Sequence, residues 1–381
     1  MTYPSVDALQ KVLSEKVFHY ATDKKKASGR ALGTLVEIIT FYTLRAWGFR
    51  DALAIERPLA EYGNPEITHN VEYSIHPIIS NIKHTLTSVT LPLTSRKICR
   101  ELWGENYIRE NQKNNQLFTA EGILRNACTI LESATTFHVA HLNNYDATTA
   151  QCAISVTELY RNPYAIFECK RVGIEEGMRK GPQTIEKAKQ GAYVARTVSC
   201  LQKARLNDGR AAGLIQRFDG SIEFGPYDEL LKRTIDSQEA EFLKKFILTV
   251  GVVSNHGNWF TADNHNKEMK VLAQSYDWLL FLTDKGLSDF ISEMLLNPVK
   301  ELEPARTAFL ASYNGEKTGT RFTKVQMDSE ADLVLQNYFS RHPEKIESWF
   351  NIITPRGASL KDLRNELKKL SEKKWKEIQG V

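Results

Sequence analysis

Three short apolar runs separated by helical patterns constrain the fold of this chain more than any other feature. Residues 164–167, 246–253 and 278–282 are largely apolar and short enough to be buried strands. Helical patterns over 182–205 and 264–275 separate them, and another follows at 287–296. Strands and helices therefore alternate from about residue 146 to 296. This order predicts an α/β core, with a mixed central β-sheet flanked by helices.

The flanking sequence predicts further elements. Helices are expected over residues 5–20 and 28–47, with Ser28 as the N-cap of the second and Gly48 after its end. Residues 50–120 are mixed and contain candidate strands at 71–82 and 88–93 and a candidate helix at 95–103. A helix over 119–135 and two strands over 146–159 and 163–170, joined by a turn, complete the pattern.

Length and composition limit the class of protein. A chain of 381 residues is long enough for two domains, or for one large domain with insertions. We expect a core over residues 1–300 with an insertion at about 50–140, followed by a mostly helical, basic region over 301–381. The net charge of +4 permits a nucleic-acid partner without requiring one.

The cysteines and the apolar runs predict a cytoplasmic protein. Five cysteines are scattered and never form a Cys-x-x-Cys sequence, so we expect reduced, mostly buried thiols and no zinc site. The N-terminal sequence lacks the pattern of a signal peptide, and the apolar runs are shorter than the roughly 20 residues of a membrane helix.

A carboxylate and an ammonium group close one of the predicted strands. Glu168, Cys169 and Lys170 follow the apolar residues 164–167, and polar, glycine-containing sequence comes next. Side chains alternate along a strand, so Glu168 and Lys170 share one face. A carboxylate can hold a divalent metal while a lysine stabilises an anionic oxygen. This chemistry is suited to cleaving a phosphodiester.

The sequence Glu-x-Lys occurs four times, so its position decides its meaning. The other three copies lie in polar stretches with a helical pattern, where such pairs are typical surface charge; they begin at Glu268, Glu366 and Glu372. Glu168 alone ends an apolar strand. A surface ion pair at the strand end remains the alternative interpretation.

A metal-dependent phosphodiesterase needs a second carboxylate near the same cation. Asp146 is the favoured candidate, because it opens the strand predicted before Glu168 and adjacent strands would bring the two together. Glu158 is the alternative, although we expect it at the far end of that strand. Glu37, inside the largely apolar helix 28–47, is a third acidic candidate unless it simply points to solvent.

These residues together resemble the PD-(D/E)XK nuclease superfamily, and within it type II restriction endonucleases. The resemblance covers roughly residues 28–47 and 146–296, and the helix that begins near Gln183 fits it as well. Tyr145 stands where the family pattern has proline, which weakens the assignment of Asp146. The long gap between Glu37 and Asp146 implies an insertion, which in this family commonly carries base recognition.

The resemblance implies a role for each of these residues. Asp146 and Glu168 would bind Mg²⁺, with the backbone carbonyl of Cys169 as a further ligand. Lys170 would orient or activate the water and stabilise the transition state, and Glu37 would be an auxiliary acid. The products would carry a 5′-phosphate and a 3′-hydroxyl. The expected enzyme is a homodimer that cuts double-stranded DNA at a short specific sequence, with a cognate DNA methyltransferase in the same cell.

Basic residues near the predicted site are candidates for phosphate contacts. We expect such contacts from the loop after the strand, which contains Arg171, Arg179 and Lys180, although a solvated loop is the alternative. In the helix that follows, Gln183 and Lys187 are one turn apart and could face the scissile strand of the DNA. Residues 356–381 contain eight basic and four acidic residues, which is either a solvated helical face or a second phosphate-contacting surface.

Three alternative functions remain at this point. His256, Asn258 and His265 loosely resemble a His-Asn-His metal site, but nothing marks the ββα unit that such a site needs. A structure-selective repair or recombination nuclease would share the same core. A non-catalytic DNA-binding protein on a degenerate nuclease fold would retain the fold without cleavage. The hydrolytic hypothesis in this form depends on Asp146 and Glu168 sharing one pocket.

Overall fold

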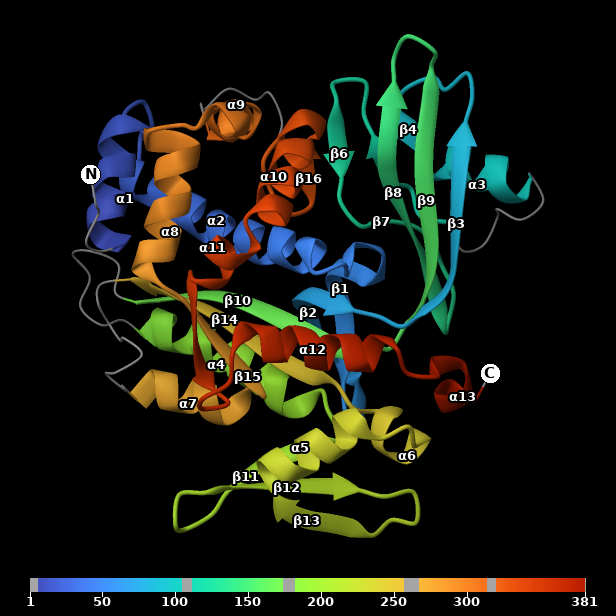
Figure 1. Ribbon diagram of the computed structural model, residues 1–381, viewed down its shortest axis with the longest axis vertical. Coiled ribbons are helices and arrows are strands. Elements are labelled where there is room, and N and C mark those ends of the chain that lie inside the picture. The colour runs from blue at the N-terminus through green and yellow to red at the C-terminus, as the bar shows by residue number, and fades with distance from the viewer. Residues whose placement is uncertain (1–5, 105–111, 174–181, 257–266, 314–319, 381) are drawn as a thin grey trace.

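A six-stranded mixed sheet forms the centre of the protein in a computed structural model, which describes residues 6–104, 112–173, 182–256, 267–313 and 320–380. Its strands lie in the order β1 (Leu53–Glu61), β2 (Asn64–Ile75), β10 (Ala165–Gly173), β14 (Leu248–His256), β15 (Trp278–Leu282) and β17 (Phe350–Thr354). β10, β14 and β15 run parallel, whereas the other neighbours are antiparallel. The mixed α/β architecture predicted from the alternating pattern is confirmed (Figure 1).

Helices cover both faces of this sheet. The side chains of Val250 and Val252 lie in the cluster that includes helix α2 (Lys24–Ala46), whereas Val253 packs with α4 (Pro182–Thr197) and α7 (Lys267–Ser275). Neighbouring residues of a strand point to opposite faces, so α2 lies on one side and α4 and α7 lie on the other. Both faces are buried, which explains why the parallel strands read as continuous apolar runs.

The chain leaves the central sheet between β2 and β10 and builds a separate module, residues 78–160. One of its sheets contains β3 (Ile78–Leu86), β9 (Gln151–Tyr160), β8 (Thr136–Asp146) and β7 (Cys128–Glu132). The other contains β6 (Ile123–Arg125), β5 (Gln116–Phe118) and β4 (Leu93–Thr94), and α3 (Ser95–Trp103) follows β4. A strand from the C-terminal region, β16 (Gln326–Asp328), joins this second sheet beside β6. Pro77 and Pro163 flank this insertion module, and neither has an N–H group to continue a ladder.

Several elements differ from their sequence-based predictions. The insertion starts at Ile78 rather than near residue 50, because β1 and β2 belong to the central sheet. Residues 119–135 form β6 and β7 instead of a helix, with a turn at Ala127, whose φ is +44°. The helix expected to reach residue 205 ends at Thr197, because the following segment pairs as β11 (Leu201–Arg205) with β12 (Ala211–Gln216).

The remaining elements surround the core. The helices are α1 (Val6–Lys16), α5 (Tyr227–Asp236), α6 (Ala240–Leu243), α8 (Asp284–Ile291), α9 (Glu303–Tyr313), α10 (Ser329–Arg341), α11 (Pro343–Glu347), α12 (Leu360–Ser371) and α13 (Trp375–Gln379). Short helical turns occupy Arg50–Ala52, Ser292–Leu296 and Lys300–Leu302, and β13 (Ile222–Pro226) completes the small sheet with β11 and β12.

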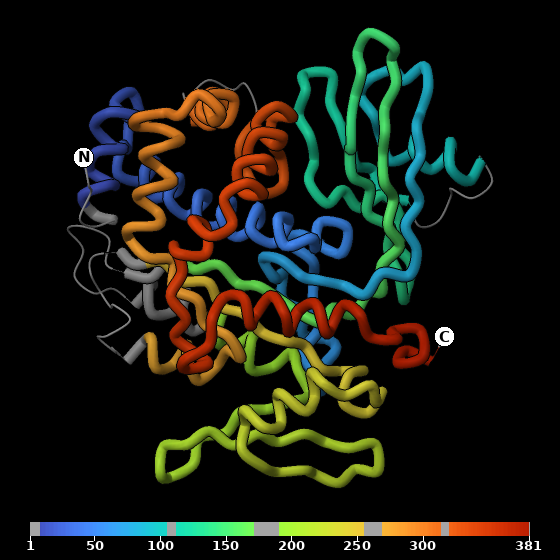
Figure 2. The backbone as a smooth tube through the Cα atoms, viewed as in Figure 1, coloured from blue at the N-terminus to red at the C-terminus, as the bar shows by residue number. Residues whose placement is uncertain are grey.

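The C-terminal region packs against the core. Asp332 of α10 accepts two hydrogen bonds from Arg45 of α2, of 2.5 and 3.2 Å, and one from Tyr42 of 2.7 Å. In the backbone trace α12 crosses in front of the central sheet, and the described ends of the chain lie on opposite sides of the molecule (Figure 2). In the parts of the chain that the structure describes, every helix is too short or too polar to cross a membrane.

Candidate active site

Glu168 and Lys170 lie on one face of β10, as the strand alternation predicts. The Lys170 Nζ is 3.1 Å from Glu168 Oε2. The Glu168 side chain is 5% exposed, whereas that of Lys170 is 31% exposed. The pair lines an open cavity of about 600 Å³ between β2, β10 and α4. A buried carboxylate thus meets a solvent-accessible ammonium group at the floor of a space large enough for a substrate group.

Gly191 of α4 lines this cavity and packs closely against Tyr276. A Cβ atom built there would lie 2.6 Å from the Tyr276 hydroxyl and 3.7 Å from the Lys170 side chain. A larger residue would therefore clash with the buried tyrosine hydroxyl, while its contact with the lysine would be an ordinary van der Waals contact. Opposite α4, His69 of β2 also lines the cavity and is paired at 2.8 Å with Glu61.

Burial dominates the electrostatics of Glu168. Desolvation raises the pKa of Glu168 above its usual value, and the positive charge of Lys170 opposes this increase. A site with these properties favours a bound cation, because a second positive charge stabilises the ionised carboxylate. A buried glutamate without such compensation would take up a proton more readily.

Glu72 is the neighbour of Glu168 in the adjacent strand. The antiparallel register pairs Phe167 with Tyr73, so the next position brings Glu72 next to Glu168. The main-chain N–H of Glu72 donates a 3.3 Å hydrogen bond to Glu168 Oε1. The Glu72 side chain is 9% exposed. The main chain of Glu72 therefore contacts Glu168, whereas the Glu72 carboxylate contacts Lys324.

Glu37 of α2 lies close enough to Lys170 and Lys324 to be affected by their charges. Burial raises the pKa of Glu37, and the charges of Lys324 and Lys170 oppose the increase. The Glu37 main-chain carbonyl accepts a 2.8 Å hydrogen bond from the Tyr73 hydroxyl, which fixes α2 against β2. Glu37 therefore points toward other charged groups, rather than simply to solvent.

Lys324 joins the acidic residues into one cluster. Its Nζ contacts the Glu72 carboxylate and lies 3.1 Å from Glu56 Oε1 and 3.4 Å from Glu37 Oε2. The Lys324 side chain is 10% exposed, so this cation is almost fully buried among three carboxylates. We call Glu37, Glu56, Glu72 and Lys324 the carboxylate–lysine cluster.

The structure corrects the expected placement of Asp146. Asp146 ends β8 in the insertion module, whereas β10 lies in the central sheet, so the two strands are not neighbours. The hairpin that carries Asp146 is at the tip of the module, remote from β10 (Figure 1). Its carboxylate accepts hydrogen bonds from Thr148 and Thr149 within that turn. Asp146 therefore acts as a turn cap and shares no pocket with Glu168.

Glu158, the alternative second ligand, is also outside the site. It belongs to β9 and accepts a 3.3 Å hydrogen bond from the Ser80 hydroxyl of β3. Both expectations assumed that the strand before Glu168 in sequence is its neighbour in the sheet. The whole insertion module intervenes instead, and β2 is the neighbour. The hydrolytic hypothesis, as predicted from the sequence, required Asp146 and Glu168 in one pocket. In that form it is wrong.

The remaining predicted residues are only partly described. The Cys169 side chain packs in the core cluster that includes α2, away from the Glu168 face, and metal binding by its carbonyl stays a prediction. Arg171 lies in β10, and Gln183 and Lys187 lie in α4, but their side chains are outside the described part of the structure. Four further residues lie wholly outside the described part of the structure: Arg179, Lys180, Asn258 and His265. The side chain of His256 also lies outside it.

The oxygen donors suit a hard divalent cation. Among the described residues, no three His, Cys, Asp or Glu side chains converge closely enough to enclose an ion as they stand. The buried ammonium group of Lys324 nevertheless shows that the Glu72 and Glu37 carboxylates accommodate positive charge. Carboxylate oxygens are the ligands that Mg²⁺ prefers. Glu168, Glu72 and Glu37 could hold such an ion only if their side chains moved closer together than they are in this structure.

The sequence analysis missed four residues of this region, which are Glu56, His69, Glu72 and Lys324. The pattern could have indicated Glu72, because Val71, Tyr73 and Ile75 alternate with polar residues in a strand that precedes Glu168. Nothing in the sequence around Lys324 indicates that it reaches this site.

Comparisons with known proteins add no assignment. No protein-family model, curated protein or solved structure matches this chain.

Proposed function

We propose that the protein is a Mg²⁺-dependent endonuclease with a PD-(D/E)XK-like core that cleaves double-stranded DNA. The pairing of Glu168 with Lys170 at the floor of an open cavity carries this proposal. A carboxylate beside an ammonium group, on a buried strand between two sheet neighbours, is arranged for charge stabilisation rather than for packing.

The topology around the pair supports the same proposal. Three neighbouring elements carry the residues of the candidate site. Glu37 is on an N-terminal helix, Glu72 is on an antiparallel strand, and Glu168-x-Lys170 is on the next strand of the sheet. α4 follows this strand, like the helix after the Glu-x-Lys strand in the superfamily that the motifs of this sequence resemble. In this proposal Glu72 takes the role that the sequence suggested for Asp146.

Each residue has a defined task in the proposed reaction. A bound Mg²⁺ would supply Lewis-acid activation of a phosphodiester and lower the pKa of a water molecule. Glu168 and Glu72, with Glu37 in support, would hold the cation. Lys170 faces the cavity and would donate hydrogen bonds to a phosphate oxygen or to the attacking water. Its contact with Glu168 keeps the ammonium group directed at that position.

The restriction enzyme remains the specific form of the proposal. The insertion module between β2 and β10 would contribute to base recognition, and a homodimer would present two such sites to a two-fold symmetric sequence. The enzyme would act in the cytoplasm together with a cognate methyltransferase.

Cleavage of plasmid DNA tests the proposal. Purified protein with Mg²⁺ should cut supercoiled DNA, and E168Q and K170A should each reduce the rate by at least about 10²-fold. E372Q is the matched control, since Glu372 is an exposed member of another Glu-x-Lys sequence. The nuclease proposal would be overturned if E168Q retained full activity, or if the protein cut no DNA in the presence of Mg²⁺. Discrete bands distinguish a restriction enzyme from a structure-selective nuclease.

A further inference from the structure

Lys324 occupies the place of a cation in the carboxylate–lysine cluster. Three carboxylates from three different elements surround its Nζ: Glu37 of α2, Glu56 of β1 and Glu72 of β2. The lysine comes from outside the central sheet, in the segment between α9 and β16. A lysine so deeply buried is ordinarily paired, and here it has more carboxylates than one positive charge neutralises.

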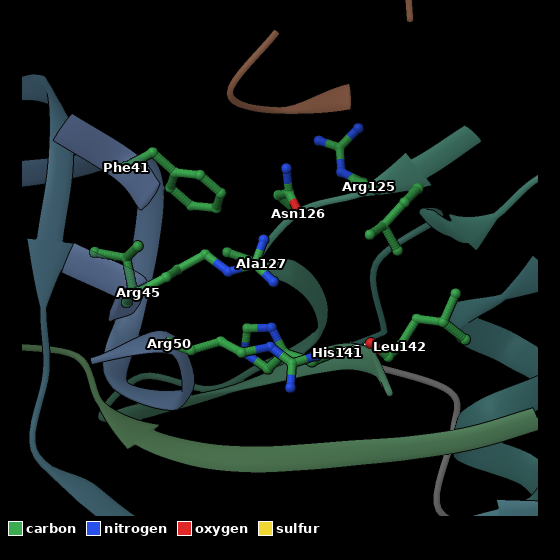
Figure 3. A pocket seen from close by; sticks show the side chains of 10 residues that line it. Phe41, Arg45, Arg50, Arg125, Asn126, Ala127, His141 and Leu142 are labelled. Atoms are coloured by element: carbon green, nitrogen blue, oxygen red, sulfur yellow. Dashed lines mark hydrogen bonds between the residues drawn. The ribbon is translucent and has the colours of Figure 1, made fainter. Parts of the chain in front are cut away.

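The position of Lys324 is fixed by the insertion module. The Asn126 side-chain amide donates a 3.2 Å hydrogen bond to the Lys324 carbonyl, and the Asn126 main-chain N–H donates a 2.8 Å bond to the carbonyl of Val325. The next residues form β16, which pairs with β6 of the module. Figure 3 shows Asn126 at the junction where the module meets the end of α2, close to Arg125 and opposite Phe41.

This arrangement links the lysine to the proposed metal site. Glu72 contacts the Lys324 ammonium group through its side chain and Glu168 through its main chain. An ammonium group and a divalent cation cannot share the same carboxylate oxygens, because their mutual repulsion is strong in a poorly solvated site. A divalent ion that binds the Glu72 oxygen now in contact with Lys324 therefore requires the lysine to withdraw from that oxygen.

We propose that Lys324 is a built-in competitor of the divalent cation, held in the carboxylate cluster by the insertion module until the cation displaces it. The proposal rests on the proposed function, since the cation is the one used in that reaction. It adds a regulatory contact: an event that shifts the module, such as DNA binding there, loosens the segment that carries Lys324. Metal occupancy is then coupled to docking of the module.

Metal binding by the full-length protein without DNA tests this inference. Mn²⁺ affinity is measured by calorimetry on the wild type, on K324M, which removes the charge and keeps a long side chain, and on K324R, which retains the charge. We expect K324M to bind Mn²⁺ about tenfold more tightly or better, and K324R to remain close to the wild type. A purely structural role predicts the opposite direction, since a disturbed site binds metal more weakly.

Two further variants complete the design. K345M is the matched control, because it removes a half-buried lysine from its 2.5 Å pair with Glu293 elsewhere in the molecule. N126A leaves every charge in place but removes the side-chain bond to the Lys324 carbonyl. We expect N126A to tighten Mn²⁺ binding by about two- to fivefold, in the same direction as K324M. If K324M does not fold, N126A alone still tests the inference.

The outcomes separate this inference from the proposed function. Wild-type binding of Mn²⁺ with unchanged or weaker binding in K324M and N126A overturns the competitor role and leaves the nuclease proposal standing. Absence of Mn²⁺ binding in the wild type and in every variant overturns both. Tighter binding in K324M and N126A, with K324R and K345M unchanged, supports the inference.

Discussion

The main-chain N–H of Glu72 donates a hydrogen bond to the Glu168 carboxylate across the boundary between β2 and β10. This bond joins two residues that are 96 positions apart in the chain. It places a second acidic residue beside the Glu-x-Lys strand, and it explains why the insertion module can lie between them in sequence without separating them in space. The candidate site is therefore built across the point where the chain leaves and re-enters the central sheet.

The identity of the second metal ligand can be tested directly. We expect E72Q to reduce Mg²⁺-dependent DNA cleavage by at least about 10²-fold, because it removes one carboxylate from the site. D146N should cleave at the wild-type rate, since Asp146 caps a turn at the tip of the module. Cleavage rates of both variants on the same plasmid provide the comparison. Loss of cleavage in D146N with full activity in E72Q would restore the sequence-based assignment.

The contact between Gly191 and Tyr276 predicts a coupled effect on stability. G191A should lower the free energy of unfolding by about 1–3 kcal/mol, because the new methyl group would lie too close to the buried Tyr276 hydroxyl. In a Y276F background the same change should cost much less, since the clashing oxygen is gone. Urea unfolding of the four proteins in this double-mutant cycle measures the coupling. Equal costs in both backgrounds would contradict the assigned contact.

The ion pair between Arg45 and Asp332 should be important for attaching α10 to the core. Both residues are buried, so D332N leaves the arginine charge without its partner and should cost about 3–5 kcal/mol of unfolding free energy. D289N is the control, because its 2.5 Å pair with Lys285 involves an exposed lysine and should be worth less than about 1 kcal/mol. Chemical denaturation measures both. If D332N lost less unfolding free energy than D289N, the buried pair would be dispensable for stability.

Buried His76 predicts a loss of stability in mild acid. Burial, followed by the charge of Arg57, lowers the pKa of His76 to about 3. Its Nδ1–H donates to the Tyr160 carbonyl, and its Nε2 accepts from the Ser74 hydroxyl, so the folded protein keeps it neutral. Below the unfolded pKa of about 6.5, the unfolded chain binds a proton that the folded chain does not. Stability therefore falls as the pH falls from about 6.5 towards 3.

Unfolding free energies at pH 7.5 and 5.0 measure this effect. We expect His76 to account for about 2 kcal/mol of the decrease between these values. In H76Q the decrease should be smaller by that amount, whatever its absolute stability. H19Q is the control, because it removes an exposed histidine elsewhere in the chain. An identical pH dependence in H76Q and the wild type would contradict the assignment.

The sequence determined the class of fold and the central pair of the site. Strand alternation alone placed Glu168 and Lys170 on one face, and the apolar runs at β10, β14 and β15 identified the buried parallel strands. These features are local, because side-chain direction in a strand and burial on two faces depend on nearby residues. The helix over α3 was likewise predicted with its observed bounds.

The tertiary structure decided which strands are neighbours. Sequence order suggested that Asp146 lies beside Glu168, but strand pairing brought Glu72 there and left Asp146 at the tip of the module. Lys324 reaches the acidic cluster through pairing of β16 with β6, which joins residues about 200 positions apart. Such long-range pairing depends on which surfaces bury one another in the folded chain. Local pattern carries no information about it, and only the assembled fold supplies it.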